Sequence, residues 1–416
     1  DGPLSLAPEE EFTGLEPRRI PVTQYGILAF RDLFAPRQML TLTTLARFIS
    51  EASERFSASV GDLLAAVHTC VAMTLSRGSD LNNSLCVWKL DAECPVHLFG
   101  RQAIPMVWEF AEAAPLGQAS GSWKGMVDRS ADAILSALGP VHVGTVEQAS
   151  ATAHPLADDS VDALVTDPPY YYSVPYADLS DFFYVWLRRL LSKLHPLLFQ
   201  DSLTPKSEEC IQNLPHSEVA ERQKSRSFYE ESMLRALGEG KRITKPAAIG
   251  VVVFAHSDTE AWESLLSALI RAGWCVTGSW PIDTELAHRV IAQRQSTLAS
   301  SVHLVCRPRE TADDSVSTDD VGDWRDVLSE LPRRIHEWMP RLAAEGVVGA
   351  DAIFACLGPA LEVFSRYSRV EKASGEQVLL REYLEQVWAA VSKEALGMIF
   401  AGGDATGFEE DARLTA

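Results

Sequence analysis

The sequence predicts an α/β protein with a doubly wound sheet, and three observations lead to this class. Between residues 140 and 308, short β-branched runs alternate with helical stretches of about 10 to 20 residues. Hydrophobic residues make up 46% of the 416 residues and charged residues 23%, as in ordinary globular proteins. No stretch of 18 uninterrupted apolar residues is present, so no membrane-spanning helix is expected. These values exclude a disordered chain, a collagen-like repeat and a coiled-coil rod.

The N-terminal third is expected to be helical. Residues 1–30 are rich in Pro, Gly and Glu and are interpreted as a linker or entry segment. From Pro36 onward apolar residues recur at three- and four-residue steps, which predicts long helices. Shorter helical patterns follow at Ile104 to Ala113 and at Ala131 to Leu138. Residues 31–139 are therefore predicted to form a helical insertion.

Residues 140–308 are expected to form the sheet domain. The last two predicted strands lie close together in sequence, so they can form an antiparallel hairpin at one edge of the sheet. In chain order, the predicted elements are the strands Val141–Val146 and Ala163–Thr166, the helices Phe182–Leu191 and Glu218–Leu237, the strand Ile249–Ala255, the helix Thr259–Ala272, and the strands Cys275–Trp280 and Val302–Cys306.

The C-terminal part is expected to contain an acidic linker followed by helices. Residues 309–323 hold six acidic and almost no apolar residues, which predicts a solvated linker. Residues 324–416 are predicted to be a helical C-terminal region, with helical patterns at Trp324–Ala344, Ala350–Tyr367 and Gln377–Ile399.

The cysteines indicate the compartment. All seven are scattered without a C-x-x-C pair, which predicts reduced thiols and a cytoplasmic protein. Cys86, Cys94 and His97 lack the spacing of a zinc site, so we expect no metal.

The acidity of the chain argues against a nucleic-acid partner only as a sum. The formal net charge is −20, yet from Arg222 to Lys245 seven basic residues face three acidic ones, a local charge of +4. Basic side chains here are candidates for phosphate contacts, with solvated helix faces as the alternative. The DNA-backbone candidates are Arg222, Lys224, Arg226, Lys241 and Arg242, joined by Arg188, Arg189 and Lys193 on a preceding predicted helix.

The sharpest motif is Asp167-Pro168-Pro169-Tyr170, directly after the apolar strand that ends at Thr166. From ordinary residue frequencies, this tetrapeptide is expected by chance in roughly one chain of this length in a thousand. Open α/β sheets bind ligands at the carboxyl ends of their strands, which is where the motif stands. The alternative interpretation is an ordinary strand-to-helix turn that begins with prolines.

These residue types suit the methylation of an exocyclic amine. The lone pair of such an amine is delocalised into the base ring, so the nitrogen is a poor nucleophile. The Asp167 carboxylate and the Pro168 carbonyl can accept its two hydrogens, which favours a tetrahedral nitrogen with a free lone pair. Consecutive prolines stiffen the turn and preorganise both acceptors. Tyr170 and Tyr171 offer ring faces on which an extruded base can stack.

The run DALVTDPPYYYSVPYADLSDFFYVWLRRLL at 162–191 resembles the catalytic motif of DNA amino-methyltransferases, specifically the large prokaryotic adenine-specific DNA methylases that also carry a zinc ribbon. The resemblance extends over nearly the whole chain. Further matching segments are YGILAFRDLFAPRQMLTLTTLARF at 25–48, FGRQAIPMVWEFAEA at 99–113, SATAHPLADDSVDALVTDPPYY at 150–171, VVVFAHSDTEAWESLL at 251–266 and FSRYSRV at 364–370.

The resemblance implies a Rossmann-like S-adenosylmethionine-dependent methyltransferase sheet, with DNA as substrate and a role in restriction-modification or phage defence alongside partner subunits. It assigns Asp167 to Tyr170 to catalysis. It also assigns Ser150, Ala151, Thr152 and Asp167 to the methyl donor, and Trp280 to the target base. Ser150 as an ordinary turn residue and Trp280 as a core tryptophan are the alternatives.

One expected feature of that family is missing. The Gly-rich loop that holds the methionine end of the donor is not present, because Phe400 to Gly403 and Gly238 to Lys241 fit helix caps better. The chain is therefore expected to be the later part of a longer enzyme whose sheet lacks its first strands here. A non-catalytic recognition or scaffold fragment, and methylation of RNA or of a protein glutamine, stay open as alternatives.

Overall fold

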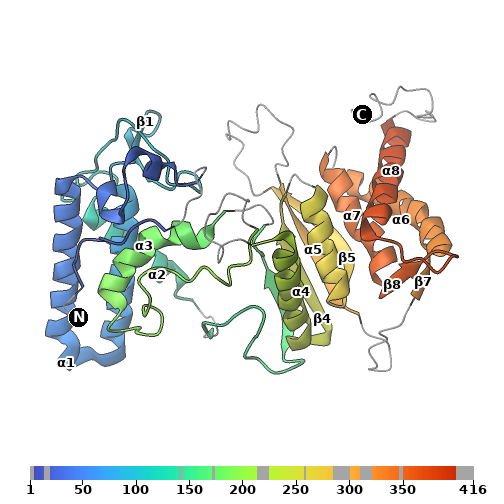
Figure 1. The fold of residues 1–416 in the computed structure, drawn as a ribbon, viewed down its shortest axis with the longest axis horizontal. Coiled ribbons are helices and arrows are strands. Elements are labelled where there is room, and N and C mark those ends of the chain that lie inside the picture. The colour runs from blue at the N-terminus through green and yellow to red at the C-terminus, as the bar shows by residue number, and fades with distance from the viewer. Residues whose placement is uncertain are drawn as a thin grey trace. The chain divides into compact units, whose positions relative to one another are not determined.

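A mixed four-stranded sheet flanked by helices forms the larger of two compact units in the computed structural model (Figure 1). One unit holds the described parts of residues 1–146 and 174–209, and the other those of 147–173, 210–212 and 224–416. The structure describes residues 4–13, 19–139, 142, 144–170, 174–212, 224–256, 259–283, 300–309, 321–345 and 350–399.

Helices dominate the first unit. The break in α1 is at Gly61, whose φ of 49° is in the left-handed region that glycine adopts without a Cβ penalty. The elements of this unit are the 3-10 helices η1 (Pro21–Tyr25) and η2 (Phe30–Leu33), the helices α1 (Pro36–Leu81), α2 (Trp123–Ala137) and α3 (Tyr176–Leu191), and a hairpin of β1 (Val87–Lys89) and β2 (Cys94–Val96).

The core of the first unit lies between α1 and α3. Phe182, Val185 and Trp186 of α3 are completely buried and belong to the same apolar cluster as Leu42 and Leu75 of α1. The helix that follows the Asp167 motif therefore packs with the N-terminal helices, whereas the expected boundaries placed it in the sheet domain. Its broad apolar face is the physical reason, since it is buried against α1.

The sheet of the second unit has the order β3-β4-β6-β5. Strands β3 (Val161–Thr166) and β4 (Thr244–Phe254) are parallel, whereas β6 (Ser300–Pro308) runs antiparallel to both β4 and β5 (Trp274–Asp283). The expected antiparallel pairing of the last two strands is thus confirmed, with β6 inside the sheet and β5 at the edge.

Two helices cover one face of this sheet, α4 (Arg226–Ile243) and α5 (Thr259–Arg271) (Figure 1). Gly240 of α4 lies so close to Leu164 of β3 that a Cβ there would come within 2.7 Å of the leucine side chain. The indole N–H of Trp274 donates to the Leu237 carbonyl at 3.0 Å, joining β5 to α4. These contacts fix the helices against the strands.

The C-terminal helices pack beside β5 and belong to the same core. The closest approach is at Gly358, whose N–H donates to the Ser279 hydroxyl of β5 at 2.7 Å. The remaining elements are α6 (Trp324–Ala344), α7 (Ala350–Ser365) and α8 (Leu380–Ile399), with a parallel pair of β7 (Val321–Asp323) and β8 (Arg369–Glu371).

Two expected elements in the first half of the chain differ from the structure. Residues 104–113 form no helix, because Pro105 lacks a backbone donor and the N–H of Ala111 bonds to the Cys86 carbonyl at 2.8 Å. In the expected strand Val141–Val146, residues 144–146 are exposed and not in a strand, while 141 and 143 lie outside the described residues.

Later in the chain, two boundaries move. The helix expected from Glu218 begins at Arg226, where the Ser225 hydroxyl accepts the Phe228 N–H as an N-cap; residues 218–223 lie outside the described part. The last three residues of the expected acidic linker pair with β8 as strand β7, and 310–320 are not described.

A test of this packing replaces Gly358 by alanine. A Cβ at this position would lie 2.2 Å from the backbone of Gly278, so Gly358→Ala is expected to lower the free energy of unfolding by about 3 kcal/mol or more. Gly238→Ala is the control, because a Cβ there meets nothing within 4 Å and is expected to stabilise α4 by about 0.5 to 1 kcal/mol. Urea unfolding measures both, and equal stabilities would contradict the close approach.

Candidate active site

The Asp167 motif lies at the carboxyl end of the parallel strands β3 and β4. Asp167 directly follows Thr166, the last residue of β3, so its predicted position at the carboxyl end of a strand is confirmed. Its side chain is exposed, Pro168 is buried, and Pro169 and Tyr170 are half-buried. The motif therefore presents a carboxylate to solvent, while the three residues that follow it are partly or fully buried.

An aromatic cluster fixes that backbone. The ring of Tyr170 meets the ring of Phe254, the last residue of β4, edge-on with 5.1 Å between centroids. Phe254 in turn contacts Trp262 of α5 at 4.9 Å. The completely buried Tyr229 of α4 donates its hydroxyl to the Pro169 carbonyl at 2.9 Å. The turn is thus held from β4, α4 and α5 at once.

Sequence reasoning missed Tyr229 and Phe254 as supports of the motif. The sequence predicts Phe254 within a strand and Tyr229 within a helix, but no local spacing marks either residue as a partner of Pro169 or Tyr170. The Tyr229 hydroxyl and the Pro169 carbonyl are 60 residues apart in sequence. Only the crossover from β3 through α4 to β4 brings the two segments together.

Ser150, Ala151 and Thr152 belong to a turn that precedes β3. Ser150 and Thr152 form a local turn, in which their hydroxyls are 2.9 Å apart and the Thr152 N–H donates to the Ser150 hydroxyl. No hydrogen bond in the described part of the chain joins this turn to Asp167. The turn interpretation of Ser150 thus fits the observed geometry.

The segment after this turn is anchored at the opposite end of the strands, where β3 and β4 begin. The His154 N–H donates to the Glu239 carboxylate at 2.9 Å, and Arg242 donates to the carbonyls of His154 and Leu156. Both anchoring residues lie in the last turns of α4, immediately before β4 begins. The anchor is therefore at the amino ends of β3 and β4, whereas Asp167 is at their carboxyl ends.

Arg242 is engaged in this anchor. Its guanidinium pairs with Asp158 at 2.5 Å and with Glu239 at 3.0 Å. The hydrogen bond from Arg242, followed by that from the His154 N–H, lowers the pKa of Glu239. The hydrogen bonds to Glu239 and then to Asp158 raise the pKa of Arg242. As a candidate for DNA phosphate, Arg242 would have to leave two carboxylates.

The other basic candidates differ in their surroundings. Lys224 was expected to be a surface cation, but it is only 5% exposed, with its Nζ 5.5 Å from the centre of the Phe228 ring. Lys241 is half-buried near the end of α4. Arg189, which we expected to contact phosphate, is buried in an ion pair with Glu10 at 2.8 Å. Arg222 and Tyr171 lie outside the described residues.

Of the basic candidates on α4, Arg226 is the one at the end of the helix near the motif. It begins α4, one turn before Tyr229, whereas Lys241 and Arg242 end the same helix about 24 Å away. Its guanidinium pairs with Glu230 at 2.8 Å and with Glu260 at 3.4 Å. The two ends of α4 thus lie at opposite ends of the strands, so their basic residues do not form one patch.

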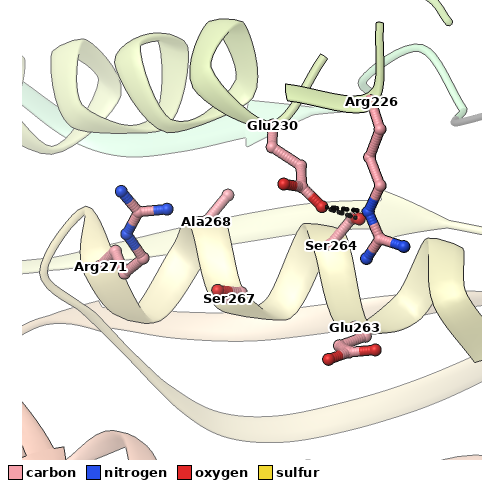
Figure 2. Close-up of a pocket in the computed structure, with 7 residues that line it drawn as sticks. All are labelled: Arg226, Glu230, Glu263, Ser264, Ser267, Ala268 and Arg271. Carbon is pink, nitrogen blue, oxygen red and sulfur yellow. Dashed lines mark hydrogen bonds and ion pairs between the residues drawn. The ribbon is translucent and has the colours of Figure 1, made fainter. Parts of the chain in front are cut away.

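A small pocket of about 220 Å³ opens beside Arg226, between α4 and α5 (Figure 2). Glu230 accepts hydrogen bonds from both Arg226 and Ser264 there. The charged residues that line it are two arginines and two glutamates, so it presents no net positive charge. The lining consists of Arg226, Glu230, Glu263, Ser264, Ser267, Ala268 and Arg271.

Trp280 is not a core tryptophan. Its side chain is 47% exposed on β5, where it is in register with His303 of β6. Because β4 and β6 separate β5 from β3, three strand spacings or about 14 Å lie between the two strands. Trp280 therefore lies on the strand at the opposite side of the sheet from β3.

Comparisons of the chain with protein-family models, with curated proteins and with solved structures find no match. In the described part of the chain, no helix is long and apolar enough to cross a membrane. The same residues contain no group of three or more His, Cys, Asp or Glu side chains placed to hold a metal ion.

Replacing Tyr229 tests how the motif is held. Tyr229→Phe removes the donor to the Pro169 carbonyl and is expected to destabilise the sheet unit by about 1 kcal/mol, because the half-buried carbonyl loses its partner. Hydrogen exchange at the Asp167 and Tyr170 amides should become faster. Tyr184→Phe, which removes a hydroxyl bond to the Asp201 carbonyl in the other unit, should leave that exchange unchanged. Unchanged exchange in Tyr229→Phe would contradict this support.

Proposed function

We propose that this chain carries the catalytic motif of an S-adenosylmethionine-dependent DNA methyltransferase that acts on the exocyclic amine of a flipped base, with adenine as the target. One observation carries the proposal. Asp167-Pro168-Pro169-Tyr170 directly follows a parallel strand, at the carboxyl end where open α/β sheets bind ligands, on a backbone fixed by Tyr229 and Phe254.

The chemistry assigned to these residues is acceptance and positioning. The exposed Asp167 carboxylate accepts one amine hydrogen and the Pro168 carbonyl accepts the other. The base amine then approaches tetrahedral geometry with its lone pair directed away from the ring. Tyr170 supplies a stacking surface worth about 1 to 3 kcal/mol per base, and its contact with Phe254 keeps the ring in place. Because the acceptors are preorganised, they cost no reorganisation during the reaction.

The topology of the sheet supports a Rossmann-like methyltransferase interpretation. The parallel pair β3 and β4 is followed by a strand hairpin in which β6 runs antiparallel. An antiparallel hairpin at the end of an otherwise parallel sheet is typical of methyltransferase-type folds. The resemblance of residues 162–191 to adenine-specific DNA methylases supports the same assignment.

The residues assigned to the donor do not fit a complete pocket for S-adenosylmethionine. Ser150 and Thr152 bond to each other in an exposed turn, and the segment that follows is anchored at the edge opposite Asp167. S-adenosylmethionine would supply the methyl group in this proposal, and no step is derived through it from these residues. Part of the donor site must therefore come from elsewhere.

The same observation favours a second candidate function. A chain that holds the base-binding motif without a donor pocket would act as a non-catalytic recognition or scaffold element on DNA. Methylation of RNA or of a protein glutamine by the same chemistry differs from the main proposal only in substrate. The substrate and the presence of transfer therefore separate these candidates.

The deciding experiment measures labelled methyl transfer from S-adenosylmethionine to DNA, RNA and protein, using the complete gene product. Asp167→Ala is expected to lower transfer to DNA by at least about 10²-fold, because a preorganised electrostatic contact is lost. Asp162→Ala is the matched control, since it removes an exposed carboxylate of the same strand that pairs with Lys245 at 2.6 Å. It should transfer at the normal rate.

Each other outcome points to one alternative. Full transfer by Asp167→Ala would refute the mechanism. Transfer to RNA or protein but not to DNA would identify the other substrates. DNA binding with no transfer and no donor binding by the complete product would identify the scaffold.

A further inference from the structure

The first three residues of the motif can accept hydrogen bonds from a base but cannot donate any. The ionised carboxylate of Asp167 is an acceptor only, and Pro168 and Pro169 have no backbone N–H. A flipped adenine brings acceptors of its own, because the ring nitrogens N1 and N7 flank its exocyclic amine. An acceptor that leaves water without gaining a partner costs free energy. The base therefore needs a donor that these three residues do not supply.

The hydroxyl of Tyr170 is not placed to be that donor in the proposed reaction. The Tyr170 ring is assigned to stacking on the base, and a stacked ring lies in a plane parallel to its partner. The hydroxyl lies in the plane of its own ring, so it stays above or below the base and does not face the base edge that carries N1 and N7. The donor must therefore come from a neighbouring element.

His256 is on the strand that pairs directly with β3. Thr166 and Val252 are in parallel register, so the chain leaves β3 and β4 at the same end, about one strand spacing of 5 Å apart. His256 comes two residues after Phe254, the last residue of β4, and its side chain is half-buried. The following strand in the sheet, β6, is one spacing farther from β3.

One buried ring connects His256 to Tyr170. The imidazole lies against the ring of Phe254, with 6.2 Å between centroids and 22° between the planes, and Tyr170 meets the same ring at 5.1 Å. The centres of the imidazole and the Tyr170 ring are therefore at most about 11 Å apart. The indole N–H of the buried Trp262 donates to the His256 carbonyl at 2.9 Å, which fixes the backbone of this residue. A side chain that can donate is thus held beside the stacking surface.

We propose that His256 donates a hydrogen bond from its imidazole to a ring nitrogen beside the amine of the flipped adenine, N1 or N7, a role that rests on the proposed function and deepens it. A neutral imidazole carries one N–H in either tautomer, and an imidazolium carries two. A site that provides this donor rejects a base without the matching acceptor, because the N–H would then stay unpaired. His256 therefore determines which base ring is accepted.

Two substitutions separate this role from simple packing on Phe254. His256→Phe keeps a flat ring against Phe254 but has no N–H, whereas His256→Gln keeps an N–H donor without the ring. With His256 as a donor, His256→Phe is expected to lower methyl transfer to DNA at least about tenfold, and His256→Gln to keep more transfer than His256→Phe. Packing alone predicts the reverse order. The unfolding midpoint of His256→Phe should equal that of the parent protein.

A second histidine of the same unit provides the matched control. The Nδ1 of His336 on α6 is 2.7 Å from the Glu394 carboxylate, and its side chain is exposed. His336→Phe removes an imidazole without touching the cluster around Phe254. It should transfer methyl groups at the parent rate.

Modified DNA tests the contact itself. The complete gene product receives genomic DNA amplified with 7-deazaadenine or 1-deazaadenine in place of adenine, which lack N7 and N1 respectively, and labelled transfer from S-adenosylmethionine is measured. For the analogue that lacks the contacted nitrogen, the parent should transfer at least about tenfold more slowly than to adenine, and His256→Phe should lose this discrimination. Changes in base pairing caused by an analogue affect both proteins equally, so the comparison between them isolates the contact.

Two results would overturn this role of His256 and leave the proposed function intact. One is equal discrimination by the parent and His256→Phe for both analogues. The other is more transfer by His256→Phe than by His256→Gln. Absence of transfer from the parent to ordinary DNA would instead refute the proposed function, and the role of His256 with it, so the two failures are distinguishable.

Discussion

The parallel pairing of β3 with β4 is the constraint on which the site depends. Parallel neighbours cannot be joined by a tight turn, so the chain must leave β3 at its carboxyl end and return through a helix to the start of β4. That helix is α4, and Leu164 against Gly240 sets how closely it lies on the sheet. The same crossover brings the Tyr229 hydroxyl to the Pro169 carbonyl.

From this pairing it follows that the two ends of α4 serve different purposes. Near its start, Tyr229 supports the Asp167 turn, and Arg226 forms ion pairs close by. At its end, Glu239 and Arg242 anchor the segment that leads into β3. Basic residues that are near in sequence therefore lie at opposite ends of the strands. A locally basic stretch of the sequence does not form one basic surface.

The strand and helix pattern of the sheet could largely be predicted, because it depends on local periodicity. Apolar β-branched runs around Ala163, Ile249 and Val302 are strands, and the helix expected from Thr259 is present as α5. Failures came where a distant partner decides the outcome. Arg189 looked like a surface cation, but its guanidinium is buried against Glu10, 179 residues away. The expected helix at Ile104 to Ala113 is replaced by backbone bonds to other segments.

The sequence by itself determined the mixed α/β class and the Asp167-Pro168-Pro169-Tyr170 motif at the end of a strand, because a hydrophobic run and two fixed proline φ angles act locally. Only the tertiary structure decided which side chains support the motif and which cations are already paired. These properties depend on strand order and on contacts between residues far apart in the chain, and no local pattern encodes either of them.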